Sequence, residues 1–324
     1  MIFEFNLKFF FVKIIFIFLL IFQFEVIASS KLDCKEKAFY VNNVISDAKH
    51  QNLTKAKSKA EEKGRIIAFN QLLNRLTLRK QIKDSYKIDL NKMINFIKIN
   101  NEANSTNRFL GSFDFCFNRD EVVKFFKKEN LNFAEVFSLP ISIFPIYEGP
   151  SGFVFLDEKD TWYELWKNFL NTNDSLLKFK LSTGNLALKR SIKGKEIISS
   201  NKNVLKKIIK NDSTKRILVV ILEPKLGRFG KYQLKISGKL YNETGEFDQT
   251  IFSKSRNYEN FKSITILNED LLLKDISELV YVFEESWKKN NFFKEGLITF
   301  VDVYIPIQKM QDWSNSLQLL NNLP

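Results

Sequence analysis

The sequence predicts a protein of mixed α+β and α/β class with more than one domain. Its 324 residues suffice for about two domains with hydrophobic cores. A hydrophobic content of 44%, with only 11 Gly and 6 Pro, excludes collagen-like and disordered chains. Strand-like and helix-like segments alternate along the chain. They predict an N-terminal α+β domain at 29–138, a middle α/β domain with a mixed sheet at 139–290 and a strand–helix unit at 291–324.

Residues 1–28 have the layout of a secretory signal peptide. Lys8 and Lys13 precede an apolar run from Ile14 to Phe22, and Ala28 is small enough for a signal peptidase site. The run has nine residues, whereas a membrane-spanning helix needs about 20. We expect cleavage after Ala28, export to the periplasm of a Gram-negative bacterium and no transmembrane anchor in the mature chain. The alternative is an uncleaved leader that anchors the chain in the inner membrane.

The N-terminal domain is predicted to combine strands with one long and two shorter helices. Apolar residues recur every three or four positions from Ala56 to Leu76, which indicates an amphipathic helix. Side chains of a strand point alternately to its two faces, so Phe109, Phe113, Phe115 and Phe117 would share one face. They indicate a half-buried strand with Asp114 and Cys116 on its opposite face. The predicted elements are a strand at Lys37–Ser46, helices at Asn52–Leu78 and Asn91–Ile97, a strand at Arg108–Phe117 and a helix at Asp120–Glu129.

The middle domain is predicted as a mixed sheet with helices between its strands. The run Arg216–Leu222 is apolar after its first residue and indicates a buried central strand. Trp162 and Trp166 are four residues apart and share one face of a helix, which favours packing in the core over a carbohydrate-binding platform. The predicted strands are Ile141–Phe144, Leu176–Leu181, Arg216–Leu222, Tyr232–Tyr241 and Phe247–Phe252. Further helices are predicted around Val204–Ile209 and from near Asn268–Asp270 to Trp287.

The last segment, 291–324, is predicted to form a strand at Leu297–Ile307 and a helix at Gln311–Leu320. One strand and one helix cannot bury their apolar faces alone. We therefore expect them either to pack on the middle domain or to begin a module that is incomplete.

Basic residues exceed acidic residues by 50 to 37, which gives a net charge of +13. Lysine greatly outnumbers arginine and is spread from Lys31 to Lys309. A nucleic-acid reader would favour arginine, because its guanidinium group binds phosphate and guanine through two hydrogen bonds. No nucleic-acid partner is therefore expected. The lysines between residues 55 and 63 are interpreted as the solvated face of a helix rather than a membrane-surface patch.

Residue types that catalytic and metal sites commonly use are scarce. His50 is the single histidine, and it stands between Lys49 and Gln51 in a polar stretch where a surface histidine is expected. The sequence contains no nucleophile elbow, phosphate-binding loop or dinucleotide-binding motif. We therefore predict no enzyme activity and no catalytic, cofactor-binding or metal-ligating residues.

The two cysteines, Cys34 and Cys116, are expected in or beside strands of the N-terminal domain. Export to an oxidising compartment would allow a Cys34–Cys116 disulfide. Two free buried cysteines are the alternative. Cys34 follows Lys31, Leu32 and Asp33 rather than small residues, so a lipid-modified cysteine is not expected.

Several short motifs follow one another along the chain. They are Ala68-Phe69-Asn70-Gln71-Leu72-Leu73-Asn74-Arg75-Leu76-Thr77, Arg108-Phe109, Phe133-Ala134-Glu135, Leu139-Pro140, Trp162 with Trp166, Glu285-Ser286-Trp287-Lys288, Val303-Tyr304-Ile305-Pro306 and Asp312-Trp313. In their order and spacing, the chain resembles the bacterial exported proteins grouped as domain of unknown function 2066. The resemblance implies no catalytic residues. It also implies a ferredoxin-like module at the C-terminus, of which 291–324 would be an incomplete βα unit, shortened at Pro324.

The order of elements in the middle domain is also similar to the small α/β domain at the amino terminus of TolB and in curli-secretion lipoproteins. That similarity implies contact with envelope proteins more than catalysis. We therefore expect a non-enzymatic protein-interaction or assembly module whose partners are other envelope proteins. The alternative is a binding protein for an anionic envelope ligand, namely a lipid headgroup, peptidoglycan or a nucleotide, held by surface lysines. The oligomeric state stays open.

Overall fold

A computed structural model describes residues 33–83, 85–149, 152–184, 186–226, 232–258, 269–293 and 309–321, together with Ile305 and Ile307. The expected signal peptide lies outside the described residues, as does the strand expected at 297–307 apart from those two isoleucines. The chain divides into two compact units. The first unit comprises residues up to 74 and 83–129, and the second comprises 75–82 and residues from 130 onward. This division differs from the expected boundary between 138 and 139.

The first unit holds a three-stranded antiparallel sheet in the order β1-β3-β2. Its elements are the 3-10 helix η1 (Lys37–Phe39), β1 (Tyr40–Lys49), α2 (Leu53–Leu76), α3 (Leu90–Met93), β2 (Ile94–Asn104), β3 (Arg108–Phe117) and α4 (Arg119–Lys128). The last two residues of α2 belong to the second unit. β3 has the predicted bounds, and β1, α2 and α4 agree with their predictions to within three residues at each end.

The prediction of a helix at Asn91–Ile97 is correct as far as Met93 and wrong after it. From Ile94 onward the chain forms β2, which pairs with β3. No side chain of β2 is fully buried, and its last four are all exposed. The strand therefore lacks the regular alternation of buried and exposed positions by which β3 was recognised.

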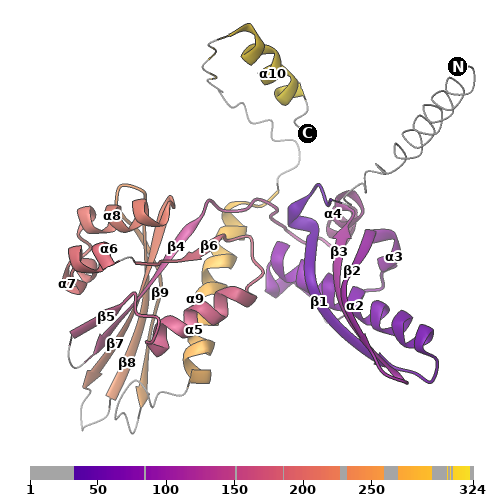
Figure 1. Ribbon diagram of the computed structural model, residues 1–324, viewed down its shortest axis with the longest axis horizontal. Helices are drawn as coiled ribbons and strands as arrows, with labels where there is room; N and C mark the ends of the chain where they lie inside the picture. Colours follow the sequence, from indigo (N-terminus) through magenta and orange to yellow (C-terminus); the bar gives the residue numbers. More distant parts are fainter. Residues whose placement is uncertain are drawn as a thin grey trace, which may run out of the picture. The chain divides into compact units, whose positions relative to one another are not determined.

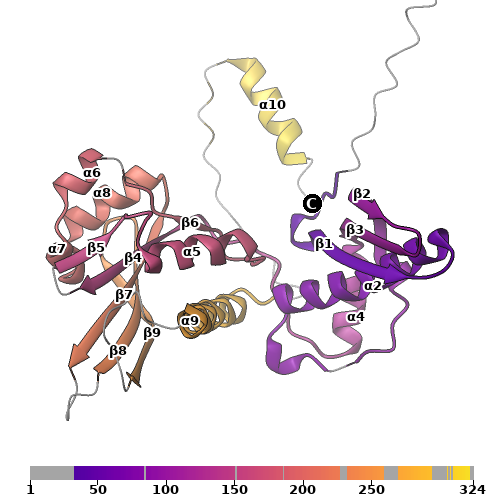
Figure 2. The same cartoon turned by 60° about the horizontal axis from the view of Figure 1, so that its bottom comes forward.

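A layer of phenylalanines forms the core between the first sheet and α2. Phe109, Phe113, Phe115 and Phe117 are fully buried on one face of β3. Gly64 lets α2 approach this layer closely, since a Cβ atom there would lie 3.2 Å from the Phe115 ring. Helices α2 and α4 lie on the same side of the sheet (Figure 2). We name the side of the sheet opposite α2 and α4 the open face.

The second unit holds a six-stranded mixed sheet. β4 and β7 are parallel neighbours, and β8 and β9 extend the sheet beyond β7 as an antiparallel hairpin. β5 and β6 pair with the other edge of β4. The strands are β4 (Ile141–Gly149), β5 (Gly152–Phe155), β6 (Phe179–Leu181), β7 (Arg216–Leu226), β8 (Tyr232–Tyr241) and β9 (Phe247–Tyr258). The predicted mixed sheet is confirmed, although β5 was not predicted.

Helices cover both faces of this second sheet (Figure 1). One face carries α6 (Leu186–Ser191), α7 (Gly194–Ile198) and α8 (Lys202–Asp212), and the other carries α5 (Thr161–Thr172) and α9 (Glu269–Asn290). Alternate side chains of β7 enter the two cores, Leu218 toward α5 and α9 and Ile217 toward α6–α8. Trp162 and Trp166 are fully buried in the first of these cores. They are therefore core residues, as predicted, and not a carbohydrate platform.

Residues 75–82 pack into the second unit although they follow α2 in the chain. Thr77 and Phe133 form an isolated antiparallel bridge, and the Ala134 N–H donates to the Leu76 carbonyl with an N-to-O distance of 2.9 Å. The 3-10 helix η2 (Arg79–Gln81) completes the segment. The second unit is thus built from two separate stretches of sequence.

The helix predicted at Gln311–Leu320 is present as α10 (Met310–Asn321). Met310 and Trp313 are exposed on it. Among the described residues, no helix combines the length and apolar character needed to cross a bilayer.

Candidate functional site

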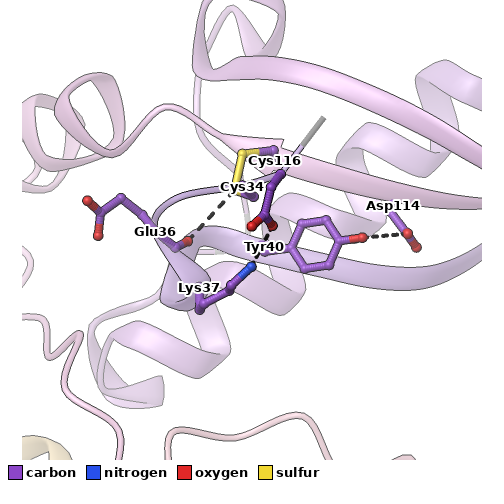
Figure 3. Close-up of a disulfide and its surroundings, with 7 residues drawn as sticks. Cys34, Glu36, Lys37, Tyr40, Asp114 and Cys116 are labelled. Atoms are coloured by element: carbon purple, nitrogen blue, oxygen red, sulfur yellow. Dashed lines mark hydrogen bonds and ion pairs between the residues drawn. A yellow bond between two sulfur atoms is a disulfide. The ribbon is translucent and has the colours of Figure 1, made fainter. Parts of the chain in front are cut away.

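Cys34 and Cys116, the residues singled out in the sequence, are joined by a disulfide in the structure (Figure 3). Their sulfur atoms are 2.01 Å apart and their Cα atoms 5.7 Å apart. The bond links the segment before β1 to β3, the central strand of the first sheet. Both residues are buried, which keeps the sulfur atoms away from external thiols. The pair therefore acts as a structural tie rather than a reactive site.

A cleft of about 480 Å³ lies beside the disulfide. The charged residues in its lining are Asp33, Lys35, Glu36, Arg119 and Asp120, of which three are acidic and two basic. Such a balance does not concentrate positive charge for an anion. Across the part of the chain that the structure describes, no group of three or more His, Cys, Asp and Glu residues is arranged to hold a metal ion. The cleft is therefore a poor candidate for an anion or metal site.

Asp114 lies on the open face at the centre of a hydrogen-bonded cluster. Its carboxylate accepts from the Tyr40 hydroxyl (2.5 Å), the Asn43 backbone N–H (2.9 Å) and the Asn100 side-chain amide (2.6 Å). Asn43 and Asn100 lie where the pairing registers of β1 and β2 shift against β3. Only 5% of Asp114 is exposed. Burial and the neighbouring Asp114 carboxylate raise the pKa of Tyr40 to about 12. One carboxylate thus ties two irregular strands to β3.

The open face also carries an apolar groove of about 190 Å³. Ile45 of β1 is 68% exposed and Leu110 of β3 is 39% exposed. Asp47, the register partner of Leu110, forms an ion pair of 2.7 Å with Arg108, and Glu102 of the groove lining pairs with Lys57 of α2 at 2.7 Å. The groove is lined by Ile45, Asn101, Glu102, Ala103, Leu110, Gly111 and Ser112. An apolar floor with a charged rim is typical of a surface that contacts another protein.

Buried charges in the second unit hold residues 75–82 against α9 and against the segment that follows α5. Lys288 is 2% exposed, and its Nζ donates to the Thr77 carbonyl at 2.9 Å. Burial lowers the pKa of Lys288. Arg75 is also buried and forms an ion pair with Asp174. Because an unpaired buried charge is strongly destabilising, these contacts fix the segment in place.

Helices α6–α8, which lie on one face of the second sheet, and the residues beside them carry many basic side chains. Between residues 189 and 216 the chain has ten basic and two acidic residues, a net charge of +8, compared with +13 for the whole chain. We name the ten basic residues the basic layer. They are Lys189, Arg190, Lys193, Lys195, Lys202, Lys206, Lys207, Lys210, Lys215 and Arg216. All of them are exposed except Lys189 and Arg216, which are partly exposed.

Among the residues that the structure describes, few carboxylates pair with the basic layer. Lys202, Lys215 and Arg216 lie 2.8, 3.0 and 3.8 Å from carboxylates at or beside the β8–β9 turn. For the other seven side chains, no carboxylate of the described residues lies within 4.0 Å. The layer therefore presents a largely uncompensated positive charge to its surroundings.

The arrangement of α8 explains how the basic layer forms. Val204 and Ile208 are buried against the sheet, and Lys206, Lys207 and Lys210 are exposed on the other side of the helix. Within residues 187–216, no large apolar side chain is exposed. The surface is therefore charged without being apolar.

His50 lies in the turn between β1 and α2, as expected for a surface residue. It is partly exposed, and its Nδ1 accepts a hydrogen bond from the backbone N–H of Asn52 at 3.0 Å. This contact organises the turn ahead of α2 and gives the histidine a local structural role.

No family model matches the chain, and no curated protein matches it. Solved structures that resemble parts of it include a lipoprotein of Neisseria meningitidis, at 13% identity and a TM-score of 0.26, covering 44% of this chain and 97% of that chain. PelC of Paraburkholderia phytofirmans has 7% identity and a TM-score of 0.27, with 46% and 89% covered. A hypothetical protein of Chlamydia trachomatis has 10% identity and a TM-score of 0.28, with 44% and 96% covered. These scores are too low to assign a function.

Proposed function

We propose that the chain is an exported bacterial envelope protein that acts, without enzyme activity, as a protein-interaction or assembly module. The observation that carries this proposal is the apolar groove on the open face. The signal-like pattern of residues 1–28 supports export, and so does the Cys34–Cys116 pair, because stable disulfides form in oxidising compartments. The sequence motifs that resemble the domain of unknown function 2066 family point to the same assignment, although no family model matches the chain.

The size and lining of the groove favour a protein partner over a small ligand. Its volume of about 190 Å³ is below the roughly 300–1,000 Å³ of typical small-molecule sites. It suits one or two side chains of a partner. Covering Ile45 and Leu110 would remove apolar surface from water, and the Arg108–Asp47 ion pair beside Leu110 would help to exclude water from the contact.

A photo-crosslinking amino acid at Ser112, in the groove lining, tests this proposal in intact cells. We expect discrete protein adducts at Ser112 that disappear when Ile45→Glu places a charge in the groove. The matched control is the same crosslinker at Ile66, which is 53% exposed on α2 outside the groove. Adducts that persist with Ile45→Glu, or that are equal at Ile66, would contradict the proposal.

Cell fractionation and thiol mapping test the location. We expect the protein in the osmotic-shock fraction, with a Cys34–Cys116 linked peptide that appears only without reductant. Recovery from the cytoplasm with two alkylatable thiols would overturn the exported assignment.

The basic layer favours a second candidate function, the binding of an anionic envelope ligand such as a lipid headgroup, peptidoglycan or a nucleotide. It concentrates positive charge, in contrast to the cleft beside the disulfide. A ligand that binds only the native state must raise its stability. Thermal unfolding with each ligand class tests this function, and no shift at saturating concentrations with any class would remove it.

A further inference from the structure

We propose that the basic layer docks the protein on the anionic phospholipid headgroups of a bilayer. This inference rests on the second candidate function and specifies its ligand. It describes peripheral binding by the folded protein, through residues that lie far from the N-terminal leader in sequence.

The first argument is charge. Seven basic-layer side chains lack a carboxylate partner among the described residues, and the stretch that carries the layer has a net charge of +8. A basic residue close to an anionic lipid surface strengthens binding by roughly fivefold. Several such residues acting together therefore give measurable binding, although each contributes little.

The second argument is the form of the surface. Lys202, Lys206 and Lys210 follow one another at four-residue intervals and so line one side of α8. Their long side chains can reach headgroups while the apolar residues of the helix stay in the core. With apolar residues of α8 buried, the contact is electrostatic and does not insert into the acyl region. Added salt should weaken it.

The composition of the layer favours lipid over an acidic protein partner. Cores of protein interfaces are enriched in aromatic residues and arginine and depleted in lysine. The basic layer has eight lysines and two arginines, and the stretch from 189 to 216 contains no aromatic residue. Lysine serves as a point charge, which is sufficient for a fluid array of anionic headgroups that needs no fixed geometry.

The lysines of α2 provide a contrast within the same chain. Lys57 and Lys63 pair with Glu102 and Asp47, at 2.7 and 3.3 Å. Glu61 also stands among them on the helix. Their surface is thus partly neutralised, which suits the solvated helix face expected from the sequence. Exposed lysines of this region are therefore a matched control.

Vesicle co-sedimentation tests the inference. The purified protein is mixed with vesicles of phosphatidylglycerol and phosphatidylcholine in equal parts, or with vesicles of phosphatidylcholine alone. We expect binding to the anionic vesicles that weakens as salt is added. The triple variant Lys206→Gln, Lys207→Gln, Lys210→Gln should bind about a hundredfold less tightly. The triple variant Lys55→Gln, Lys59→Gln, Lys63→Gln, on the exposed surface of α2, has the same net charge and should bind like the original protein.

Three results would overturn the inference. The first is equal binding of the protein to neutral and anionic vesicles. The second is an equal loss of vesicle binding in both triple variants. The third is binding of the protein to polyglutamate through the basic layer, with no binding to anionic vesicles. The last would assign the surface to an acidic protein. A stability shift with nucleotide or peptidoglycan fragments but no vesicle binding would leave the second candidate function standing and remove lipid as its ligand. Unchanged circular dichroism of both variants confirms that they fold.

Discussion

The two sheets of this protein are stabilised in different ways. Within the part of its unit that the structure describes, the first sheet packs on α2 and α4 through one face, and its open face is held by the Asp114 cluster and the Cys34–Cys116 disulfide. The second sheet buries apolar side chains on both faces, as Ile217 and Leu218 of β7 show. A small sheet with one exposed face therefore depends on covalent and polar ties, whereas a sheet between two helical layers depends on apolar burial.

Removing the disulfide with Cys34→Ser and Cys116→Ser should have the largest effect, confined to the first unit. The bond joins residues 82 positions apart. Releasing a loop of this length lowers the free energy of unfolding by on the order of 4 kcal/mol. Hydrogen exchange read by mass spectrometry should accelerate in β1 and β3 and stay unchanged in β7. A similar loss of protection in β7 would contradict the difference between the sheets.

Leu218→Ala should produce the corresponding loss in the second unit. Leu218 is fully buried, so its truncation leaves a cavity and lowers the free energy of unfolding by about 3 kcal/mol. Leu110→Ala on the open face is the matched control and should change it by less than about 0.5 kcal/mol. All four tryptophans lie beyond residue 130, in the second unit, so hydrogen exchange of β7 and of β3 is used to measure the two changes. Equal losses at the two positions would show that burial does not determine the effect.

Asp114→Asn should weaken the first unit by about 2 kcal/mol, because a charged acceptor of three hydrogen bonds becomes neutral. Asp120→Asn is the control, since its side chain is 81% exposed. Hydrogen exchange of β1 and β2 measures the change. Unaltered exchange in Asp114→Asn would show that the cluster does not tie these strands to β3.

The smallest effect should appear at high pH through Tyr40. The pKa of its hydroxyl rises from 10.0 to about 12 in the folded protein. The unfolded chain then loses this proton first, so the contribution of Tyr40 to stability is complete below pH 10 and is lost between pH 10 and about 12. Tyr40→Phe should remove this part of the pH dependence of unfolding. If the free energy of unfolding of Tyr40→Phe falls equally between pH 10 and about 12, the loss of stability comes from other titrating groups.

Elements with a regular buried stripe were predictable from sequence, and the others were not. The phenylalanines of β3 and the apolar spacing of α2 reveal which face is buried. β2 has no fully buried side chain, and its start was therefore assigned to a helix. α6 and α7, with six and five residues, are too short to show a helical period.

The candidate surfaces were harder to predict because they depend on tertiary structure. Asp114 was expected opposite the phenylalanines, but its burial depends on shifts in strand register that bring Asn43 and Asn100 to it. The basic layer is interrupted by apolar residues in sequence, so no block of charge is visible. It forms because three consecutive helices cover the same face of one sheet.

The packing of residues 75–82 has a consequence for biosynthesis. Thr77 is among the earlier residues to be made, yet its contact with Lys288 spans 211 residues. During synthesis, Arg75 lacks its ion-pair partner until Asp174 has been made, and Thr77 lacks Lys288 until α9 has been made. A chain interrupted before α9 would leave this segment without its buried lysine, and such a product is a natural target for proteases. The second unit can therefore complete its packing only after α9, which is made late in synthesis, is present.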